Sequence, residues 1–522
     1  MSLFRDDERA IAEGLAALAD TNPFGPERID HERGALGSAF ARYSDVWHVD
    51  VALDGLNPNT NALRDVAGSL ADRARERLAS GGAARASARD LVVYEALCRF
   101  ALYMAYEDEL MALVRAGERG ERASGRVACW PRFERDHARL LRIEGVRLPA
   151  AVAASAGTLF AWGFQIRRAF HHVFRRIYGG SMPAARLRAA VWESIFTRDP
   201  ARYRRALVDR MGDVPTLITG ETGTGKELVA RAIALSRFIA FDVERGTFAE
   251  DYATCFHAVN LAALSPGLIE SELFGHRRGS FTGALEDRAG WLEACSERGS
   301  VFLDEIGELA PELQVKLLRV LEQRTFQRIG ETRDRRFAGK ILAATNRDLA
   351  AEIDDGRFRE DLFYRLCADA VRTPTLREQL ADAPDDLPNL LLVIARRVAG
   401  DDEAPALVDE VQRCVARDLG ADYAWPGNVR ELEQCVRSVL VRGTYRPERT
   451  RRRATGGLAG ELARAIEDGA LGADDLVRLY CTHVYARTRS YEETGRRLGL
   501  DRRTVKAKLD RERLARLEDG DA

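Results

Sequence analysis

The spacing of hydrophobic positions changes twice along the chain. Residues 1 to about 175 are rich in Ala, Arg, Leu and Glu, with helical spacing and few strand-like runs. From about 176 to 442, short apolar runs such as PTLITG, SVFLDE and GKILAATN alternate with amphipathic stretches. This alternation predicts an α/β unit with a mostly parallel sheet. Helical spacing then returns, first over LPNLLLVIARRVAG and NVRELEQCVRSVLVRG and then to the end of the chain.

These changes divide the chain into predicted domains. We expect a mostly helical region over 1–175, an α/β domain with a helical lid over 176–444, and an all-α region over 458–522. The intervening segment 445–457 is strongly basic and punctuated by Pro and Gly, so we predict a linker. The most apolar run, 91–114, carries several charged residues, which indicates a buried or amphipathic helix rather than a membrane span.

Composition narrows the class of protein. The 522 residues are 46% hydrophobic and 31% charged, typical of a soluble globular protein. Because the net charge is only −2, any binding to nucleic acid must be local. The eight cysteines form no CxxC pair, which favours a reducing compartment and argues against a zinc site or a disulfide framework. The N-terminus has no apolar segment typical of a secretory signal, so we predict a cytoplasmic protein.

A glycine-rich stretch provides the strongest local signal for chemistry. It lies between the strand-like PTLIT and the helical LVARAIAL. Glycines in such a turn let backbone N–H groups point at phosphates, while a lysine reaches the β- and γ-phosphates. The general pattern has Ser or Thr after the lysine, where this chain has glutamate, and a coincidental turn is the alternative. The predicted nucleotide-binding residues are Gly220, Glu221, Thr222, Gly223, Thr224, Gly225, Lys226 and Glu227.

An acidic pair ends the next strongly apolar run, GSVFLDEIGEL. Phosphoryl transfer needs one acid to hold Mg²⁺ and another group to orient the attacking water. We therefore assign Asp304 to Mg²⁺ and Glu305 to water activation, and we predict ATP and Mg²⁺ as cofactors. A solvated acidic strand end is the alternative, but the preceding phosphate loop makes it the weaker interpretation.

Several polar residues downstream could complete such a site. Asn346 closes the strand-like ILAATN and could contact the γ-phosphate or the attacking water, although a lone Asn is more often a turn former. Arg359 and Arg365 could stabilise charge on a transferred phosphoryl group. In WPGNVREL, Arg430 follows Asn428, which we predict to cap a helix.

Residues 176–442 closely resemble the AAA+ ATPase module of bacterial enhancer-binding proteins, the activators of sigma-54 RNA polymerase. The resemblance rests on a set of stretches found together: GETGTGKELVARAI, ELFGHRRGSFTGA, GSVFLDEIGEL, LLRVLEQRTFQRIG, AATNRDL, FREDLFYRL and WPGNVREL. In this family glutamate is usual after the phosphate-loop lysine, so Glu227 fits. Two regions depart from it: 235–256 is longer than usual and should lie away from the ATP site, and the segment before the phosphate loop resembles the adenine-pocket segment only loosely.

The resemblance assigns roles to the candidate residues. It implies that Lys226, Asp304 and Glu305 bind and hydrolyse ATP, and that Asn260 restrains the catalytic glutamate until the γ-phosphate is sensed. It makes Asn346 the first sensor and Arg430 the second. It also implies that Arg359 and Arg365 reach the site of a neighbouring subunit, which requires a ring, usually a hexamer.

The resemblance also explains a glycine-flanked stretch that fits neither a helix nor a strand. The family loop is usually GAFTGA and projects toward the sigma factor and promoter DNA. Here Ser280 replaces the usual alanine, a change between two small residues that should preserve flexibility. Phe281 and Thr282 would form the contacting tip. The predicted sigma-54 contact loop is Gly279, Ser280, Phe281, Thr282, Gly283 and Ala284.

The C-terminal segment SYEETGRRLGLDRRTVKAKLD fits a helix-turn-helix. Ser490 and Asp501 can cap two short helices, and Gly499 can make the turn between them. The stretch resembles the Fis-type module of enhancer-binding proteins, except that Thr494-Gly495 replaces two alanines and should weaken the first helix. A basic helical hairpin is the alternative. The predicted contacts to double-stranded DNA are Arg502, Arg503, Thr504 and Lys506, and such modules usually pair as dimers.

Region 1–175 has no strand-end acidic cluster of the kind a phosphorylatable receiver domain carries, and we interpret it as a sensory or protein-interaction domain. We expect its Trp130, His137 and His171-His172 to be packing or surface residues. For the whole chain we predict a sigma-54-dependent transcriptional activator whose ATPase ring remodels the closed polymerase–promoter complex from an upstream DNA site. A DNA-binding repressor and an AAA+ remodeller of another protein are the alternatives.

Overall fold

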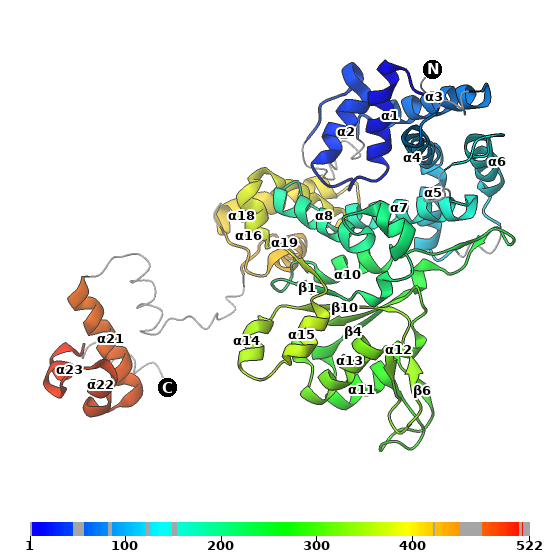
Figure 1. The fold of residues 1–522 in the computed structure, drawn as a ribbon. Coiled ribbons are helices and arrows are strands. Elements are labelled where there is room, and N and C mark those ends of the chain that lie inside the picture. The colour runs from blue at the N-terminus through cyan, green and yellow to red at the C-terminus, as the bar shows by residue number, and fades with distance from the viewer. Residues whose placement is uncertain are drawn as a thin grey trace. The chain divides into compact units, whose positions relative to one another are not determined.

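The computed structural model describes residues 3–44, 57–81, 86–121, 126–148, 154–420, 423–447, 472–510 and 514. The chain divides into two compact units, Met1–Thr444 and Tyr445–Ala522 (Figure 1). Most of the predicted linker, residues 448–457, lies outside the described residues. Within the described part of the chain, no helix combines the length and the apolar character needed to cross a bilayer.

A five-stranded sheet lies at the centre of the first unit. The strand order is β11-β1-β10-β7-β4, and all four pairings are parallel. All residues of β10 are buried, as expected for a strand covered on both faces. The predicted parallel α/β sheet is therefore confirmed. The strands are β1 (Thr216–Thr219), β4 (Phe256–Asn260), β7 (Ser300–Asp304), β10 (Lys340–Thr345) and β11 (Asp369–Arg372).

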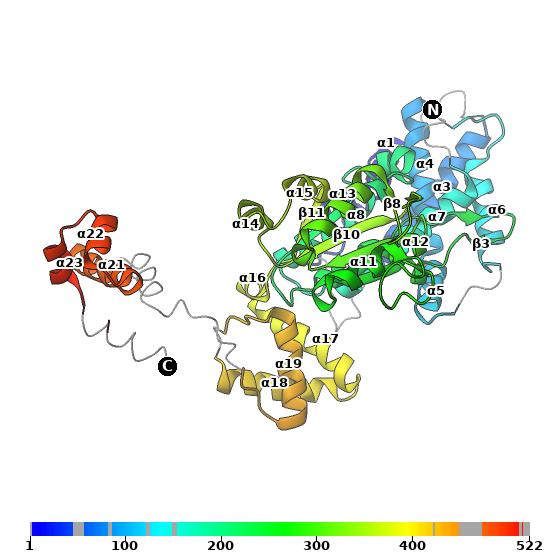
Figure 2. The same cartoon turned by 90° about the horizontal axis from the view of Figure 1, so that it is seen from below.

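Helices cover both faces of this sheet (Figure 1 and Figure 2). One face packs against α7 (Ala156–Arg176), α8 (Met182–Phe196) and α10 (Lys226–Ala234). The other face packs against α11 (Pro266–Phe274), α13 (Pro311–Gln323) and α15 (Glu360–Leu366). The predicted boundary at 175/176 falls at the end of α7, a helix that packs directly on α10.

Two further groups of helices complete the unit. The N-terminal group is α1 (Asp6–Leu18), α2 (Glu27–Leu36), α3 (Thr60–Ala79), α4 (Ala88–Ala105), α5 (Glu107–Glu118) and α6 (Trp130–Leu141). The lid follows the sheet and consists of α16 (Leu376–Asp382), α17 (Leu387–Ala399), α18 (Ala404–Asp418) and α19 (Asn428–Arg442). The short helices α9 (Pro200–Arg202), α12 (Trp291–Ala294) and α14 (Leu349–Asp354) lie between strands or before them.

The unusually long segment 235–256 forms an antiparallel hairpin of β2 (Phe241–Asp242) and β3 (Thr247–Phe248). Its aromatic rings enter the core of the N-terminal helices. Phe241 lies 4.5 Å from Trp130 and Phe248 lies 4.2 Å from Phe164, measured between ring centroids. We call residues 241–248 the anchored hairpin.

Three hydrogen bonds extend this attachment on either side of the hairpin. The Tyr252 hydroxyl donates to the Val114 carbonyl of α5 at 2.5 Å. The buried guanidinium of Arg168 on α7 donates to the carbonyls of Leu235 and Arg237 at 2.8 and 2.7 Å. The long segment therefore joins the N-terminal helices to the end of α10.

The second unit contains α21 (Ala473–Thr488), α22 (Tyr491–Leu498) and α23 (Arg502–Lys508). Ser490 accepts a bond from the Glu493 amide, and Asp501 accepts bonds from the first amides of α23. Gly499 ends α22 with φ of 65°, so both predicted caps and the predicted turn are confirmed.

Candidate active site

The predicted phosphate loop, residues 220–227, connects β1 to α10. Gly220, Gly223 and Gly225 have φ values of 150°, 82° and 90°, which residues other than glycine rarely adopt. A Cβ on Gly223 would also lie 2.3 Å from the Gly427 carbonyl oxygen. The backbone therefore requires glycine at these positions. Helix α10 begins directly after the loop, and the free N–H groups of its first turn can bind an anion such as a phosphate.

Lys226 lies inside this loop and faces the acidic pair. Its ammonium donates to the Gly220 and Glu221 carbonyls at 2.9 and 3.1 Å. Burial lowers the pKa of Lys226, while Glu305 and Asp304 act in the opposite direction. Burial also raises the pKa of Asp304, with repulsion from Glu305 in the same direction. A partly buried site with one lysine and two carboxylates can bind a phosphate chain through the lysine and a hard cation through the carboxylates.

Glu305 follows β7 in a left-handed conformation, with φ of 56° and ψ of 53°. For a residue other than glycine this is a strained backbone, a condition common at functional sites. The Glu305 carboxylate accepts a hydrogen bond from the backbone amide of Asn346 at 3.2 Å, and the side-chain amide of Asn346 donates to the Thr222 hydroxyl at 2.8 Å. The structure thus links the acid, the predicted sensor and the phosphate loop.

Asn260 lies one strand away from this network. The β4–β7 register places it opposite Asp304. Its side-chain oxygen accepts a bond from the Ala262 amide at 3.0 Å and so begins the turn after β4. In this arrangement the Glu305 carboxylate is bonded by the backbone amide of Asn346. The restraint of Glu305 by Asn260, which the family resemblance implies, stays a prediction.

The lid contacts the phosphate loop through residues 427–430. The Val429 amide donates to the Gly223 carbonyl at 3.1 Å, and a Cβ on Gly223 would lie 3.0 Å from Cβ of Arg430. Arg430 is exposed, and its positive charge contributes to lowering the pKa of Lys226. The predicted second sensor therefore lies at the phosphate loop.

The prediction that Asn428 caps a helix is wrong. The N-cap of α19 is Gly427. Asn428 is the first residue of the helix and has a left-handed conformation, with φ of 54°. Its side-chain amide instead donates to the Glu221 carboxylate and the Thr222 carbonyl, each at 3.1 Å. Its oxygen accepts a bond from the Leu376 amide at 2.8 Å. Asn428 therefore joins two lid helices to the phosphate loop.

The two predicted finger arginines lie away from this cluster, at α15. Arg359 pairs with Asp361 at 2.7 Å, and Arg365 pairs with Glu322 at 3.1 Å. Both side chains are about half exposed, at 46% and 58%. They are not among the residues that line the pocket beside the phosphate loop.

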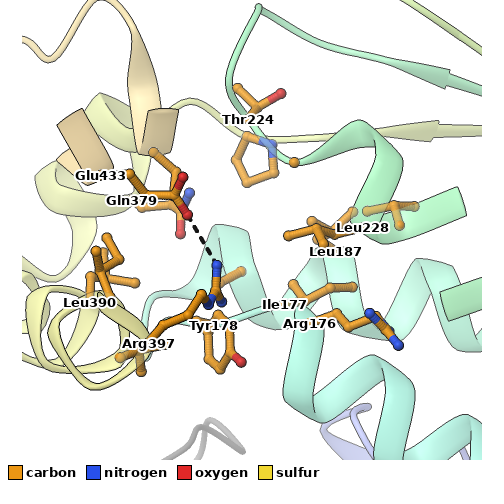
Figure 3. Close-up of a pocket in the computed structure, with 17 residues that line it drawn as sticks. Arg176, Ile177, Tyr178, Leu187, Thr224, Leu228, Gln379, Leu390, Arg397 and Glu433 are labelled. Atoms are coloured by element: carbon orange, nitrogen blue, oxygen red, sulfur yellow. Dashed lines mark hydrogen bonds and ion pairs between the residues drawn. The ribbon is translucent and has the colours of Figure 1, made fainter. Parts of the chain in front are cut away.

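A pocket lies beside the phosphate loop (Figure 3). Its walls come from the start of α10, from the turn between α7 and α8, and from the lid. Arg397 and Glu433 of the lid form an ion pair at 3.1 Å across one side. The sequence did not identify Ile177, Tyr178 or the lid helix α17 as lining residues. The only signal was the loosely matching RRIYGG before the phosphate loop.

The predicted contact loop is the end of a hairpin formed by β5 (Gly275–His276) and β6 (Arg288–Ala289). We call residues 275–289 the tip hairpin. Gly279 and Gly283 have φ of 78° and 105°, with open space where a Cβ would stand. Phe281 is 41% exposed. Among the described aromatic residues, its ring packs only against that of His276, with 5.0 Å between the ring centroids.

A second hairpin, of β8 (Thr325–Phe326) and β9 (Arg335–Arg336), lies against the base of the tip hairpin. The Ile329 amide donates to the Gly275 carbonyl at 2.9 Å. Ser280 packs on Gly330, where a Cβ would lie 2.7 Å from Cβ of Ser280. The Ser280 hydroxyl is buried without a hydrogen-bond partner among the described residues. The serine is therefore small enough for the site, but its hydroxyl gains no bond.

In the second unit, the predicted DNA contacts lie on α23. Arg502, Arg503 and Lys506 are exposed, while the Thr504 hydroxyl donates to the Asp501 carboxylate. Gly495 approaches the turn closely, because a Cβ there would lie 2.5 Å from the Leu500 carbonyl oxygen. The packing of α22 on the turn therefore favours glycine at that position.

The paired histidines of α7 lie beside Glu118. Nε2 of His171 lies 3.0 Å from that carboxylate, and His172 is buried. Burial lowers the pKa of His172 well below its usual value, and the cations Arg176 and Arg168 act in the same direction. Trp130 and His137 are likewise buried in the helical core.

Comparison with known proteins shows what this domain is similar to. Residues 201–372 match the model of the sigma-54 interaction domain. The chain is 39% identical over 309 residues to the transcriptional regulatory protein ZraR of Klebsiella oxytoca, covering 57% of this chain and 64% of that protein. It is 45% identical over 226 residues to the Nif-specific regulatory protein of Azotobacter vinelandii, covering 43% and 39%. It is 40% identical over 281 residues to the DNA-binding transcriptional regulator NtrC of Azospirillum brasilense, covering 52% and 53%.

The chain thus spans between about two fifths and two thirds of the length of these relatives. Among solved structures, NtrX from Brucella abortus in complex with ATP aligns with a TM-score of 0.38 at 24% identity, covering 68% of this chain and 75% of that one. Residues 201–372 are thus similar to the sigma-54 interaction domain, and the chain is similar over part of its length to bacterial transcriptional regulators.

Proposed function

We propose that this protein is a sigma-54-dependent transcriptional activator that hydrolyses ATP in an oligomeric ring to remodel the closed polymerase–promoter complex. The observation that carries the proposal is a pairing within one domain. An ATPase site with the described geometry occurs together with a glycine-hinged hairpin that exposes Phe281 at its tip. The match of residues 201–372 to the sigma-54 interaction domain supports the same partner.

In the proposed reaction Lys226 and the loop amides bind the phosphates of ATP. Asp304 would hold Mg²⁺, which neutralises phosphate charge when bound. The Glu305 carboxylate orients a water molecule toward the γ-phosphate and accepts its proton. Because that carboxylate also accepts the Asn346 amide bond, and Asn346 contacts Thr222 of the loop, loss of the γ-phosphate can change how Glu305 is held.

Two groups of arginines complete the proposed machinery. Arg430 senses the nucleotide from the lid of the same chain. Arg359 and Arg365 act on the nucleotide of a neighbouring subunit, because they are exposed and do not line the pocket of their own chain. An arginine in this role contributes roughly 10³- to 10⁵-fold in rate. Their replacement should therefore abolish turnover in the assembled ring while nucleotide binding persists.

The C-terminal helices tether the ring to DNA in this proposal. The exposed cations of α23 (Arg502, Arg503 and Lys506) would contact phosphates or base edges of an upstream site. Such modules usually bind two-fold related half-sites, so we propose pairing of these units.

The test uses the full-length protein with Mg-ATP and a promoter held closed by sigma-54 polymerase. The wild type should hydrolyse ATP and open the promoter, and Thr282→Ala should hydrolyse ATP without opening. Leu285→Ala is a matched control, because this residue of the tip hairpin is 80% exposed but lies outside the GSFTGA motif. Turnover by the wild type without opening would contradict the proposal and favour a repressor or a remodeller of another protein.

A further inference from the structure

The N-terminal helices, together with α7 and α8, line an open cavity of about 700 Å³, far larger than the 80 Å³ cavity beside the phosphate loop. Ligand pockets for small organic molecules commonly have volumes of this order. Its described lining residues come from α1, α2, α3, α4 and α5 and from α7 and α8. No step of the proposed ATPase reaction uses this cavity.

The lining of the cavity is rich in arginine. Among the described residues, six arginines and three carboxylates (Glu32, Glu107 and Asp108) line it. The arginines are Arg28, Arg64, Arg99, Arg115, Arg119 and Arg167. Most of them have a carboxylate partner: Arg64 and Arg167 share Glu107, Arg64 also lies 3.8 Å from Asp108, and Arg28, Arg99 and Arg119 pair with Glu32, Asp20 and Glu121. Arg115 has no ion pair among the described residues, and its positive charge favours a ligand with negative charge.

The remaining wall is apolar and aromatic. Phe100, Tyr103 and Met104 come from α4, Met111 from α5 and Phe170 from α7. Charge alone would not favour such a surface, since an ion in water loses hydration there. The combination fits a molecule with an acidic group on an aromatic or aliphatic body.

The cavity shares its walls with the nucleotide pocket. Phe170 of α7 lines the cavity and Arg176 at the end of the same helix lines the nucleotide pocket, about 9 Å further along. Trp192 of α8 lines the cavity and Leu187 of the same helix lines the nucleotide pocket. A ligand that shifts either helix therefore also moves groups that surround the nucleotide base.

We propose that this cavity binds a small hydrophobic carboxylate as an effector, and that α7 and α8 transmit its binding to the nucleotide pocket. The binding step is independent of the proposed function, whereas the transmission step rests on the ATPase activity. Calorimetry reads the first step alone, so failure of one can be distinguished from failure of the other.

The test measures binding of two probes, 3-phenylpropionate and decanoate, to the full-length protein by calorimetry. At least one carboxylate should bind about 10-fold or more tightly than its uncharged amide, because the amide lacks the charge that the arginines would pair with. Inorganic phosphate should not bind at similar concentrations, since it has no apolar body. Equal affinity for acid and amide, or no binding of either carboxylate at millimolar concentration, would overturn the proposal.

Variants localise the site. Arg64→Gln should weaken carboxylate binding about 10-fold, while Arg75→Gln should leave it unchanged. Arg75 is the matched control because it lies on the same helix with intermediate exposure but bonds the Arg139 carbonyl outside the cavity. Met111→Trp should abolish binding by filling the cavity without removing an ion pair. Unchanged affinity in both Arg64→Gln and Met111→Trp would place the ligand elsewhere.

The transmission step has its own readout. Saturating carboxylate should change the KM for ATP of the wild type and of Arg75→Gln, and should leave Met111→Trp unaffected. Binding in the calorimeter with no change in KM or kcat would remove the transmission step and leave the binding site standing.

Discussion

Two of the three short hairpins described in the first unit, the anchored hairpin and the tip hairpin, are alike in secondary structure and opposite in burial. The anchored hairpin (241–248) inserts Phe241 among the N-terminal helices, with 8% of that residue exposed. The tip hairpin (275–289) leaves Phe281 at 41% and Leu285 at 80% exposure. Two paired residues on each strand cannot hold either hairpin alone. Packing partners from elsewhere in the chain therefore hold the anchored hairpin as a rigid joint. The tip hairpin has few such partners and is free to move.

The largest expected effect tests the packing of the anchored hairpin. Phe241→Ala should lower the free energy of unfolding by about 3 to 5 kcal/mol, since it leaves a cavity among Trp130, Phe160 and Phe248. Denaturant unfolding of the full-length protein measures it. Val243→Ala is the control, because this residue of the same hairpin is 46% exposed and should cost less than about 1 kcal/mol. Equal losses would show that the joint does not depend on the aromatic core.

Hydrogen exchange compares the mobility of the two hairpins directly. The Ala249 amide bonds the Ala240 carbonyl beside the anchored hairpin at 2.9 Å, and the Ala284 amide bonds the Phe281 carbonyl in the tip hairpin at 3.0 Å. Despite these similar bonds, Ala249 should exchange about 100-fold more slowly, because its opening requires disruption of the core. Similar protection of both amides would contradict the distinction between a joint and a mobile tip.

A pair of glycines sharpens the comparison further. Gly246 and Gly279 have φ of 69° and 78°. Alanine at Gly246 should cost about 1 to 2 kcal/mol, because the held backbone cannot relax and Arg126 lies 3.1 Å from the new Cβ. Alanine at Gly279 should cost less than about 0.5 kcal/mol, because the tip hairpin can relax into open space. Thermal unfolding of both variants measures the difference, and a larger cost at Gly279 would reverse our interpretation.

The smallest expected effect concerns the serine of GSFTGA. Ser280→Ala should leave stability unchanged or raise it by up to about 1 kcal/mol, because the buried hydroxyl has no partner among the described residues. Ser296→Ala is the control, since that hydroxyl donates to Glu250 at 2.6 Å and its loss should lower stability by about 1 kcal/mol. A clear loss at Ser280 would indicate a bond that this conformation lacks.

Sequence patterns predicted the parts of the site that local backbone requirements determine. The phosphate loop needs glycines between a strand and a helix, and the acids must follow a buried strand, so the positions of Lys226 and Asp304 could be inferred from neighbouring residues alone. The parallel sheet followed from alternating apolar runs. The C-terminal caps Ser490 and Asp501 were predictable because a cap acts on amides two or three residues away.

What escaped the sequence depends on contacts between distant residues. Trp130 and Phe241 carry no pattern that pairs them, although their rings lie 4.5 Å apart. Tyr178 contributes to the nucleotide pocket only because α7 and α8 bring it beside the phosphate loop. Asn428 stands at the start of a helix, where a cap was predicted, but tertiary bonds to Glu221 and Thr222 determine its role instead.

The anchored hairpin also constrains how this protein can be recombined with others. A chimera that joins the N-terminal helices to a relative's ATPase domain without the long 235–256 segment would lose the partners of Trp130, Phe164 and Arg168. A chimera in the other direction would leave Phe241 and Phe248 without a core to enter. The N-terminal helices and the 235–256 segment therefore pack as one structural unit, although more than sixty residues of chain, including the phosphate loop, separate α7 from the hairpin.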